Sequence, residues 1–398
     1  MSHVKTPIYM DHHATTPVDP RVVAVMLPCF SEEFGNASSR SHAFGLRAEE
    51  LVDEARGQVA EFVGARKQEI IFTSGATESN NLAIKGVWES YRSKGGHIIT
   101  QVTEHKAVLD TCKYLESQGA QVTYLPVDKT GTVSIDDVKS ALRPETVLIS
   151  IMFANNEIGT LQPIRELGKL AKEHGIVFHV DGVQATGKLP LNMNEYGIDL
   201  FSFSAHKMYG PKGIGALYVR RNDPYVRLSP MMRGGGHERG IRSGTLNVPG
   251  IVGLGKACSV ASTEMSEEVS RVKSLRDRLE QGLKSGLEDV FLNGHPTERI
   301  PNNLNVSFAG VDAESLLSGL TDDMAVSSSS ACSSGGLEPS YVLKAVGTRP
   351  DLLHTAIRFG LGRFNTAEEV DYVIDRVISV VRKLRAVSPF YGDSAKNK

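Results

Sequence analysis

Between about residues 70 and 220, short β-rich runs alternate with longer amphipathic or polar stretches, and this alternation constrains the fold more than any other feature. It is typical of β-α units wound into a largely parallel sheet. Several runs are apolar throughout, as expected of strands covered by helices on both faces. The sequence predicts seven strands, at residues 69–73, 97–100, 122–127, 147–154, 176–181, 200–205 and 215–220.

The pattern changes at about residue 262, where a charged stretch with apolar residues at helical spacing begins. A chain of 398 residues is long enough for more than one domain. We therefore expect a large domain of residues 16–261 and a smaller α+β domain formed by residues 1–15 and 262–398. A closing helix is expected to begin after Thr366, which forms a capping box with Glu369.

Composition argues against two classes of partner. The chain has 44 Lys and Arg against 46 Asp and Glu, so no broad basic field is available for a nucleic acid. No apolar stretch approaches the ~18 residues of a membrane helix, and the first residues lack the apolar core of a signal peptide. We expect a cytoplasmic protein that binds neither nucleic acid nor membrane.

The four cysteines are scattered without a C-x-x-C pair, which argues against a disulfide framework or a cysteine-rich zinc site. Free thiols are usually inert core residues, and we expect this of Cys29, Cys112 and Cys258. Cys332 lies instead in the run SSSSACSSGG, which has little apolar surface to bury. The sequence therefore predicts a loop that carries a single accessible thiol.

The sequence matches one nucleotide-binding motif only in part and lacks another. GVQATGKL (182–189) matches the phosphate-binding pattern G-x-x-x-x-G-K but has Leu189 where a Ser or Thr hydroxyl is needed, and no G-x-G-x-x-G occurs. A nucleotide hydrolase is therefore only a minor alternative.

Polar residues follow several predicted strands, where ligands bind in open α/β sheets. Gly75 and Thr77 open a predicted helix whose N-H groups can hold an anion, although an ordinary capped helix fits equally well. Lys207 follows the strand at 200–205 and Asp181 ends the strand at 176–181. Pyridoxal phosphate would use both, because its aldehyde forms a Schiff base with a lysine and its ring nitrogen pairs with a carboxylate.

With these residues, the sequence resembles the fold-type-I pyridoxal-phosphate enzymes, and within them the cysteine desulfurases of the iron-sulfur cluster assembly type. The similarity runs from YMDHHATTPVDPR (9–21) to KLRAVSPFY (383–391), essentially the whole chain. The motifs that carry it are FTSGATESNN, TEHKAVLD, NNEIG, HVDGVQA, SFSAHKMYGPKGIGALYVRR, GGGHERGIRSGTLN, SSSSACSSGGLEPSYVL and IRFGLGRF. The resemblance implies a transferase whose large domain has a mainly parallel seven-stranded sheet, beside a smaller α+β C-terminal domain.

The resemblance also implies a role for each cofactor-binding residue. Lys207 is the Schiff-base lysine, Asp181 pairs with the pyridine nitrogen, and Gln184 donates to the ring hydroxyl. His105 stacks on the ring and moves substrate protons. Thr245 reaches the phosphate of a second subunit, which implies a homodimer. The phosphate cradle consists of Gly75, Ala76, Thr77, Ser204 and His206.

For the substrate, the resemblance implies that Asn156 and Arg358 hold the carboxylate of L-cysteine, that Asn36 assists and that Cys332 is the nucleophile. The chain departs from the family at Gly182, often alanine, and at Ala37, often proline. Taken singly, these residues also allow simpler interpretations: His105 could cap a helix, Arg358 could form a surface ion pair, and Gln184 could satisfy a loop.

The implied reaction converts L-cysteine to L-alanine and leaves a persulfide on Cys332, which passes to an iron-sulfur scaffold protein. A selenocysteine lyase or a sulfinate desulfinase would share the ring-binding residues, and a catalytically silent scaffold is a non-enzymatic alternative. A transient iron-sulfur cluster at Cys332 would need cysteines from a partner, because one cysteine supplies one of the usual four ligands. The sequence leaves open whether the sulfur serves general cluster assembly, nitrogenase maturation or tRNA thiolation.

Overall fold

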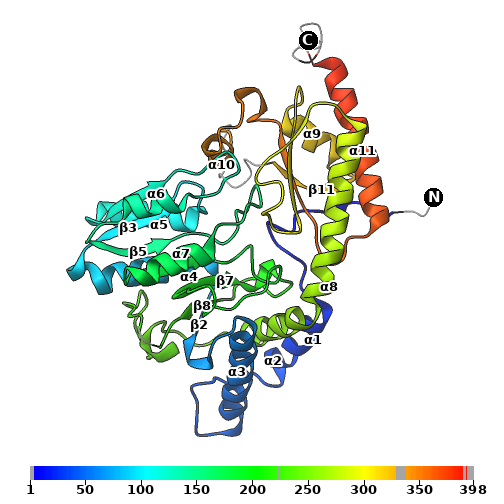
Figure 1. Cartoon of the computed structure of the whole chain (residues 1–398). Helices are drawn as coiled ribbons and strands as arrows, with labels where there is room; N and C mark the ends of the chain where they lie inside the picture. Colours follow the sequence, from blue (N-terminus) through cyan, green and yellow to red (C-terminus); the bar gives the residue numbers. More distant parts are fainter. Residues whose placement is uncertain (1–3, 223–224, 329–337, 389–390, 392–398) are drawn as a thin grey trace.

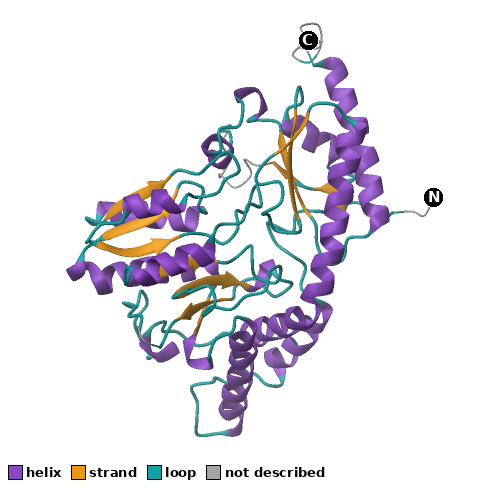
Figure 2. Ribbon diagram, viewed as in Figure 1, coloured by secondary structure: helices purple, strands orange, loops and turns teal. Residues whose placement is uncertain are grey.

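The computed structural model describes residues 4–222, 225–328, 338–388 and 391. The two larger sheets, one of seven strands within residues 70–219 and one of four strands within residues 290–360, lie in separate parts of the molecule (Figure 2). Cys332 and its Ser-rich neighbours at 329–337 lie outside the described residues.

The seven predicted strands form one sheet in the order β2-β8-β7-β6-β5-β3-β4. Pairing is parallel from β7 through β4, whereas β8 is antiparallel to both of its neighbours. This confirms the mainly parallel sheet. The strands are β2 (Ile70–Thr73), β3 (His97–Gln101), β4 (Gln121–Leu125), β5 (Thr146–Ser150), β6 (Val177–Asp181), β7 (Leu200–Ser204) and β8 (Gly215–Val219).

Two strands end at least two residues before their predicted ends. β4 ends at Leu125 because Pro126 has no N-H to continue the ladder. β5 ends at Ser150, although the backbone N-H groups of Ile151 and Phe153 still donate to β6, and Met152 and Ala154 line a pocket.

Both faces of the large sheet are covered, which explains why its strands are apolar throughout. Ile149 and Phe201 face one apolar cluster, built mainly with α1, α3, α6, α7 and the first part of α8. Leu148 and Leu200 face another, built with α4 and α5. These helices are α1 (Pro20–Met26), α3 (Ala43–Phe62), α4 (Ala76–Tyr91), α5 (Lys106–Ser117), α6 (Ile135–Ala141), α7 (Ile164–Glu173) and α8 (Val248–Gly286), with the short α2 (Pro28–Ser31) after α1.

The smaller unit has a four-stranded antiparallel sheet in the order β12-β13-β10-β9, and a parallel pair, β1 with β11. The capping box between Thr366 and Glu369 at the start of α11 is confirmed. The elements are β1 (Ile8–Tyr9), β9 (Val290–Leu292), β10 (Asn303–Phe308), β11 (Met324–Ala325), β12 (Ser327–Ser328), β13 (Ala356–Gly360), α9 (Ala313–Leu320), α10 (Tyr341–Ala345) and α11 (Ala367–Val387).

α8 joins the two units as one helix of 39 residues and does not start anew near residue 262 (Figure 1). Leu254 and Ala261 belong to the cluster under the large sheet, whereas Val272 and Leu279 belong to the cluster of the smaller unit. Ile8 and Met10 also belong to the smaller unit's cluster. The division into residues 16–261 and residues 1–15 with 262–398 stays a prediction, which this changeover supports.

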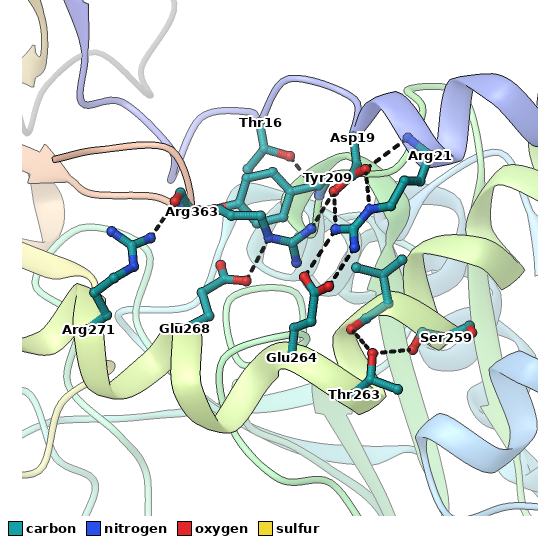
Figure 3. Close-up of polar contacts among 11 residues, drawn as sticks. Thr16, Asp19, Arg21, Tyr209, Ser259, Thr263, Glu264, Glu268, Arg271 and Arg363 are labelled. Atoms are coloured by element: carbon teal, nitrogen blue, oxygen red, sulfur yellow. Dashed lines mark hydrogen bonds and ion pairs between the residues drawn. The ribbon is translucent and has the colours of Figure 1, made fainter.

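A cluster of charged side chains ties the two units together beside α8 (Figure 3). Arg363, from the loop after β13, binds Asp19 at 2.6 Å and Glu268 on α8 at 2.7 Å. Arg21 binds the same Asp19 and reaches Glu264 on α8. Hydrogen bonds from Arg21 hold the pKa of Asp19 well below its usual range, so the carboxylate stays charged between two guanidinium groups. In the described part of the chain, no helix combines the length and apolarity needed to cross a bilayer.

Candidate active site

A pocket of about 580 Å³ opens where β5, β6 and β7 end, between the large sheet and the smaller unit. It is also lined by residues 13–15 of the N-terminal segment and by the first turns of α4 and α5. The pocket gathers most of the predicted site residues: Gly75, Ala76, Thr77, His105, Asn156, Asp181, Gln184, Ser204, His206, Lys207 and Arg358.

The first turn of α4 and the end of β7 form a cradle for an anion. Gly75 precedes the helix with a φ of 154°, a conformation that favours glycine, and Ser204 Oγ lies 3.8 Å from where a Cβ would stand. The N-H groups of the helix start point outward from such a turn. Burial lowers the pKa of His206 to about 4, so its ring is neutral and contacts Thr15 Oγ1 through Nδ1. A phosphate group fits this cradle.

Asp181 ends β6 as a buried carboxylate whose two oxygens are engaged. Asn80 Nδ2 donates to one oxygen at 2.7 Å, and the backbone N-H of Val183 donates to the other at 3.1 Å. Glu104 lies nearby, and burial together with the charge of Asp181 raises its pKa well above the usual range. Asp181, and not Glu104, lines the pocket, which suits pairing of Asp181 with a cationic ring nitrogen.

Lys207 follows β7 in the short 3₁₀ turn Ala205–Lys207 and lines the pocket. Its Nζ donates to the backbone carbonyls of His13 and Ala14, the latter at 2.8 Å. Lys188 lies buried behind it and contacts its carbonyl oxygen at 3.4 Å. Burial lowers the pKa of Lys188 to about 7. Of these two lysines, Lys207 lines the pocket wall.

His105 caps α5, as one interpretation of the sequence held, and its side chain also lines the pocket. Its Nδ1 accepts a hydrogen bond from Ala107 N at 3.1 Å, which leaves Nε2 as the nitrogen that can exchange a proton in the pocket. Burial lowers the pKa of His105, against the opposing charge of Asp181. A neutral ring that accepts at Nδ1 carries its hydrogen on Nε2, so His105 can donate a proton in the pocket.

Arg358 is buried on β13 and is no surface ion pair. Its guanidinium donates to Asp11 at 2.9 Å and to the backbone oxygen of Asn156 at 2.9 Å. Among the described residues, Arg358 Nε and Asn156 Oδ1 are buried without a hydrogen-bond partner. Buried polar atoms usually have partners, so this pair fits a ligand that brings a carboxylate and an N-H donor.

Asn36 and Thr245 are exposed and do not line the pocket of their own chain. Cys332 lies outside the described residues. The other three cysteines are free and buried, and burial raises the pKa of each thiol, that of Cys112 to about 12. Low thiolate content suits the inert role predicted for them.

Sequence reasoning missed three residues of the site: His13, Asn80 and Asp11. His13 and Asp11 lie in the motif YMDHHATTPVDPR, and Asn80 lies in FTSGATESNN. The motifs indicated that these segments belong to the site. Nothing in their spacing, however, indicates that His13 contacts Gln184 or that Asp11 contacts Arg358.

Comparison with known proteins places this site in a family. Residues 8–373 match the aminotransferase class-V model. The chain is 58% identical over 388 residues to the cysteine desulfurase IscS of Anaeromyxobacter sp. (strain Fw109-5), covering 98% of this chain and 96% of the relative.

Two solved structures are similar over most of their length. One, described as a NifS-like protein, is 38% identical with a TM-score of 0.88 and covers 94% of this chain and 99% of its own. The other, SspA in complex with cysteine, is 37% identical with a TM-score of 0.79 and covers 90% and 100%. The chain therefore belongs to the class-V aminotransferase family of fold-type-I pyridoxal-phosphate enzymes and, within it, to the cysteine desulfurases of the IscS type.

Proposed function

We propose that the protein converts L-cysteine to L-alanine and carries the removed sulfur as a persulfide on Cys332. The observation that carries this proposal is the placement of Lys207 and Asp181 at the ends of neighbouring strands, in one pocket with Arg358. Identity of 58% to a cysteine desulfurase and the cysteine complex of a 37% identical structure support it.

The cofactor is pyridoxal 5′-phosphate, as in the family to which the chain belongs. When bound, it supplies an aldehyde for an amine and a ring that delocalises charge from the substrate α-carbon. Lys207 would hold the aldehyde and Asp181 the ring nitrogen. Gln184 would donate to the ring hydroxyl, and the cradle at Gly75, Ala76, Thr77, Ser204 and His206 would hold the phosphate.

The protein's own residues then bind the substrate and move its protons. Arg358 and Asn156 would hold the substrate carboxylate, with Asn36 assisting, and this would bring the α-carbon within reach of Lys207. The amine of Lys207 takes the α-proton, and the neutral ring of His105 exchanges protons with the substrate.

The thiolate of Cys332 forms a bond to the substrate sulfur while the carbon-sulfur bond breaks. One L-cysteine and one thiol thus yield one L-alanine and one persulfide, with no further oxidant or reductant. We propose that an acceptor protein for iron-sulfur cluster assembly then takes the terminal sulfur. A cytoplasmic location stays a prediction.

An absorbance spectrum with and without substrate tests the proposed function. We expect the purified protein to absorb visible light, and L-cysteine to shift this band while alanine accumulates, because substrate and Lys207 compete for one aldehyde. Amino-acid analysis of the products measures alanine. Colourless protein that resists loading with pyridoxal phosphate would indicate a silent scaffold. Alanine formed only from selenocysteine would indicate a selenocysteine lyase.

We also propose that the protein is a homodimer. Large apolar side chains are exposed around α2 and the start of α3, among them Phe30 at 64% and Phe34 at 63%. Exposed apolar side chains gathered in one segment are typical of an interface. Thr245 is exposed and lies away from its own pocket, as the contact with a partner's phosphate requires. Two-fold pairing is the commonest closed assembly.

Light scattering should give twice the chain mass of 43.2 kDa for the natural protein. The double variant Phe30→Glu/Phe34→Glu should give the chain mass and bind pyridoxal phosphate more weakly, because charges cannot be buried unpaired in the interface. Val387→Ser, at another exposed apolar residue, is the control and should stay dimeric. A natural protein that is monomeric at micromolar concentration yet retains cofactor would contradict the proposal.

A further inference from the structure

The side-chain amide of Gln184 is held at both of its ends by one residue, His13. The Gln184 Oε1 atom lies 3.0 Å from His13 Nδ1, and Gln184 Nε2 donates to the His13 carbonyl at 3.2 Å. Both residues are buried and both line the pocket. An amide NH₂ has two hydrogens, so the His13 carbonyl takes one and the second remains for the pocket.

The other ring nitrogen of His13 determines where its proton lies. His13 Nε2 faces Nδ2 of Asn303 at 3.2 Å, at the start of β10 in the smaller unit. An amide nitrogen only donates, so His13 Nε2 accepts and the ring proton must be on Nδ1. His13 Nδ1 therefore donates to Gln184 Oε1, and the reverse orientation of the Gln184 amide would set two donors against each other.

Asn303 is in turn held in one orientation by groups that cannot reverse. Its Nδ2 also donates to the backbone oxygen of Glu157 at 3.0 Å, and its Oδ1 accepts from the guanidinium of Arg299 at 2.9 Å. A carbonyl oxygen only accepts and a guanidinium only donates. The direction of every hydrogen bond from Arg299 to Gln184 is thus determined.

We infer that His13 is a positioning residue of the active site: as a neutral ring protonated on Nδ1, it holds the Gln184 amide so that its NH₂ group faces the cofactor's ring hydroxyl. The inference rests on the proposed contact between Gln184 and that hydroxyl. It adds that residues of the smaller unit, through Asn303, set the orientation of a cofactor contact made by the loop after β6. Burial also lowers the pKa of His13 well below its usual value, in keeping with a neutral ring.

The first test needs no cofactor. In cofactor-free protein labelled with ¹⁵N-histidine, two-bond ¹H-¹⁵N correlation spectra distinguish the two neutral tautomers and the imidazolium, and the variant His13→Phe assigns the signal. We expect the Nδ1-protonated tautomer in the natural protein and a mixture of tautomers in Asn303→Ala. An Nε2-protonated ring or an imidazolium at pH 7 in the natural protein would overturn the inference.

The second test measures the pH midpoint of the cofactor's visible absorption band after loading with pyridoxal phosphate. A hydrogen-bond donor to the ring-hydroxyl oxygen stabilises the negative charge that this oxygen carries when the Schiff base loses its proton. Loss of the donor should therefore raise the pH midpoint. We expect His13→Phe to raise the midpoint by about one pH unit, because that shift corresponds to the free energy of one hydrogen bond to a charged group. Asn303→Ala should raise it less, and His174→Phe, at an exposed histidine, should not change it.

A double-mutant cycle distinguishes this inference from the proposed function. In a Gln184→Met background, His13→Phe should cause no further shift, because it acts through the lost amide. Equal shifts in both backgrounds, or a shift from Gln184→Met and none from His13→Phe, would overturn the role of His13. No shift from Gln184→Met itself would instead overturn the proposed contact with the ring hydroxyl, and with it any role of His13 in that contact.

Discussion

Replacing Cys332 by serine is expected to lower alanine and sulfide production by at least about 10²-fold, because no other positioned nucleophile can take the sulfur. The fold and the cofactor spectrum should be unchanged, since one sulfur atom is replaced by oxygen and the residue has no proposed part in holding the cofactor. L-Cysteine should still shift the visible band. Product analysis and absorbance spectroscopy measure the two effects separately.

Mass spectrometry of the natural protein after L-cysteine identifies the acceptor thiol. We expect one additional sulfur, removable by a reductant, on the peptide that contains Cys332. The variants Cys112→Ser and Cys258→Ser are matched controls, because burial raises the pKa of both thiols. Persulfide on one of these cysteines, or full activity of Cys332→Ser, would show that Cys332 is not the acceptor.

Replacing Lys207 by alanine should lower activity by about 10²- to 10⁴-fold, the range expected when a positioned general base is lost. The variant should also lose covalent attachment of pyridoxal phosphate, because the proposed Schiff-base amine is gone. Borohydride reduction followed by peptide mapping measures this attachment. Lys172→Ala, at an exposed residue of α7, is the control and should keep the adduct.

The result that would contradict this assignment is an adduct on a different lysine. Lys212 lines the same pocket, and Lys188 lies buried behind Lys207 with a pKa lowered to about 7. A reduced adduct on either residue in the natural protein would show that Lys207 does not bind the aldehyde.

The seven strands of the large sheet could be predicted because each is a short apolar run that helices bury on both faces, a local property of the sequence. That Asp181 and Lys207 line one pocket could be predicted for a related reason. Parallel strands end at one edge of a sheet, so residues that follow such strands meet there whatever the details of packing.

The length of α8 was harder to predict than its existence. Its sequence changes in character near residue 262, which suggests a boundary, yet the helix continues to Gly286. The hydrogen bonds of a helix join backbone groups four residues apart and do not depend on what the side chains contact. One helix can therefore bury Leu254 under the large sheet and Leu279 in the smaller unit.

By itself the sequence determined the sheet, the residues at its strand ends and, through its motifs, the family. Only the tertiary structure decided which residues support them: Asp11 beside Arg358, Asn80 on Asp181, and His13 between Gln184 and Asn303. These pairs are far apart in sequence. A hydrogen bond depends on the distance and direction between two groups in space. The spacing of residues along the sequence does not indicate that His13 lies beside Asn303, which is 290 residues further along the chain.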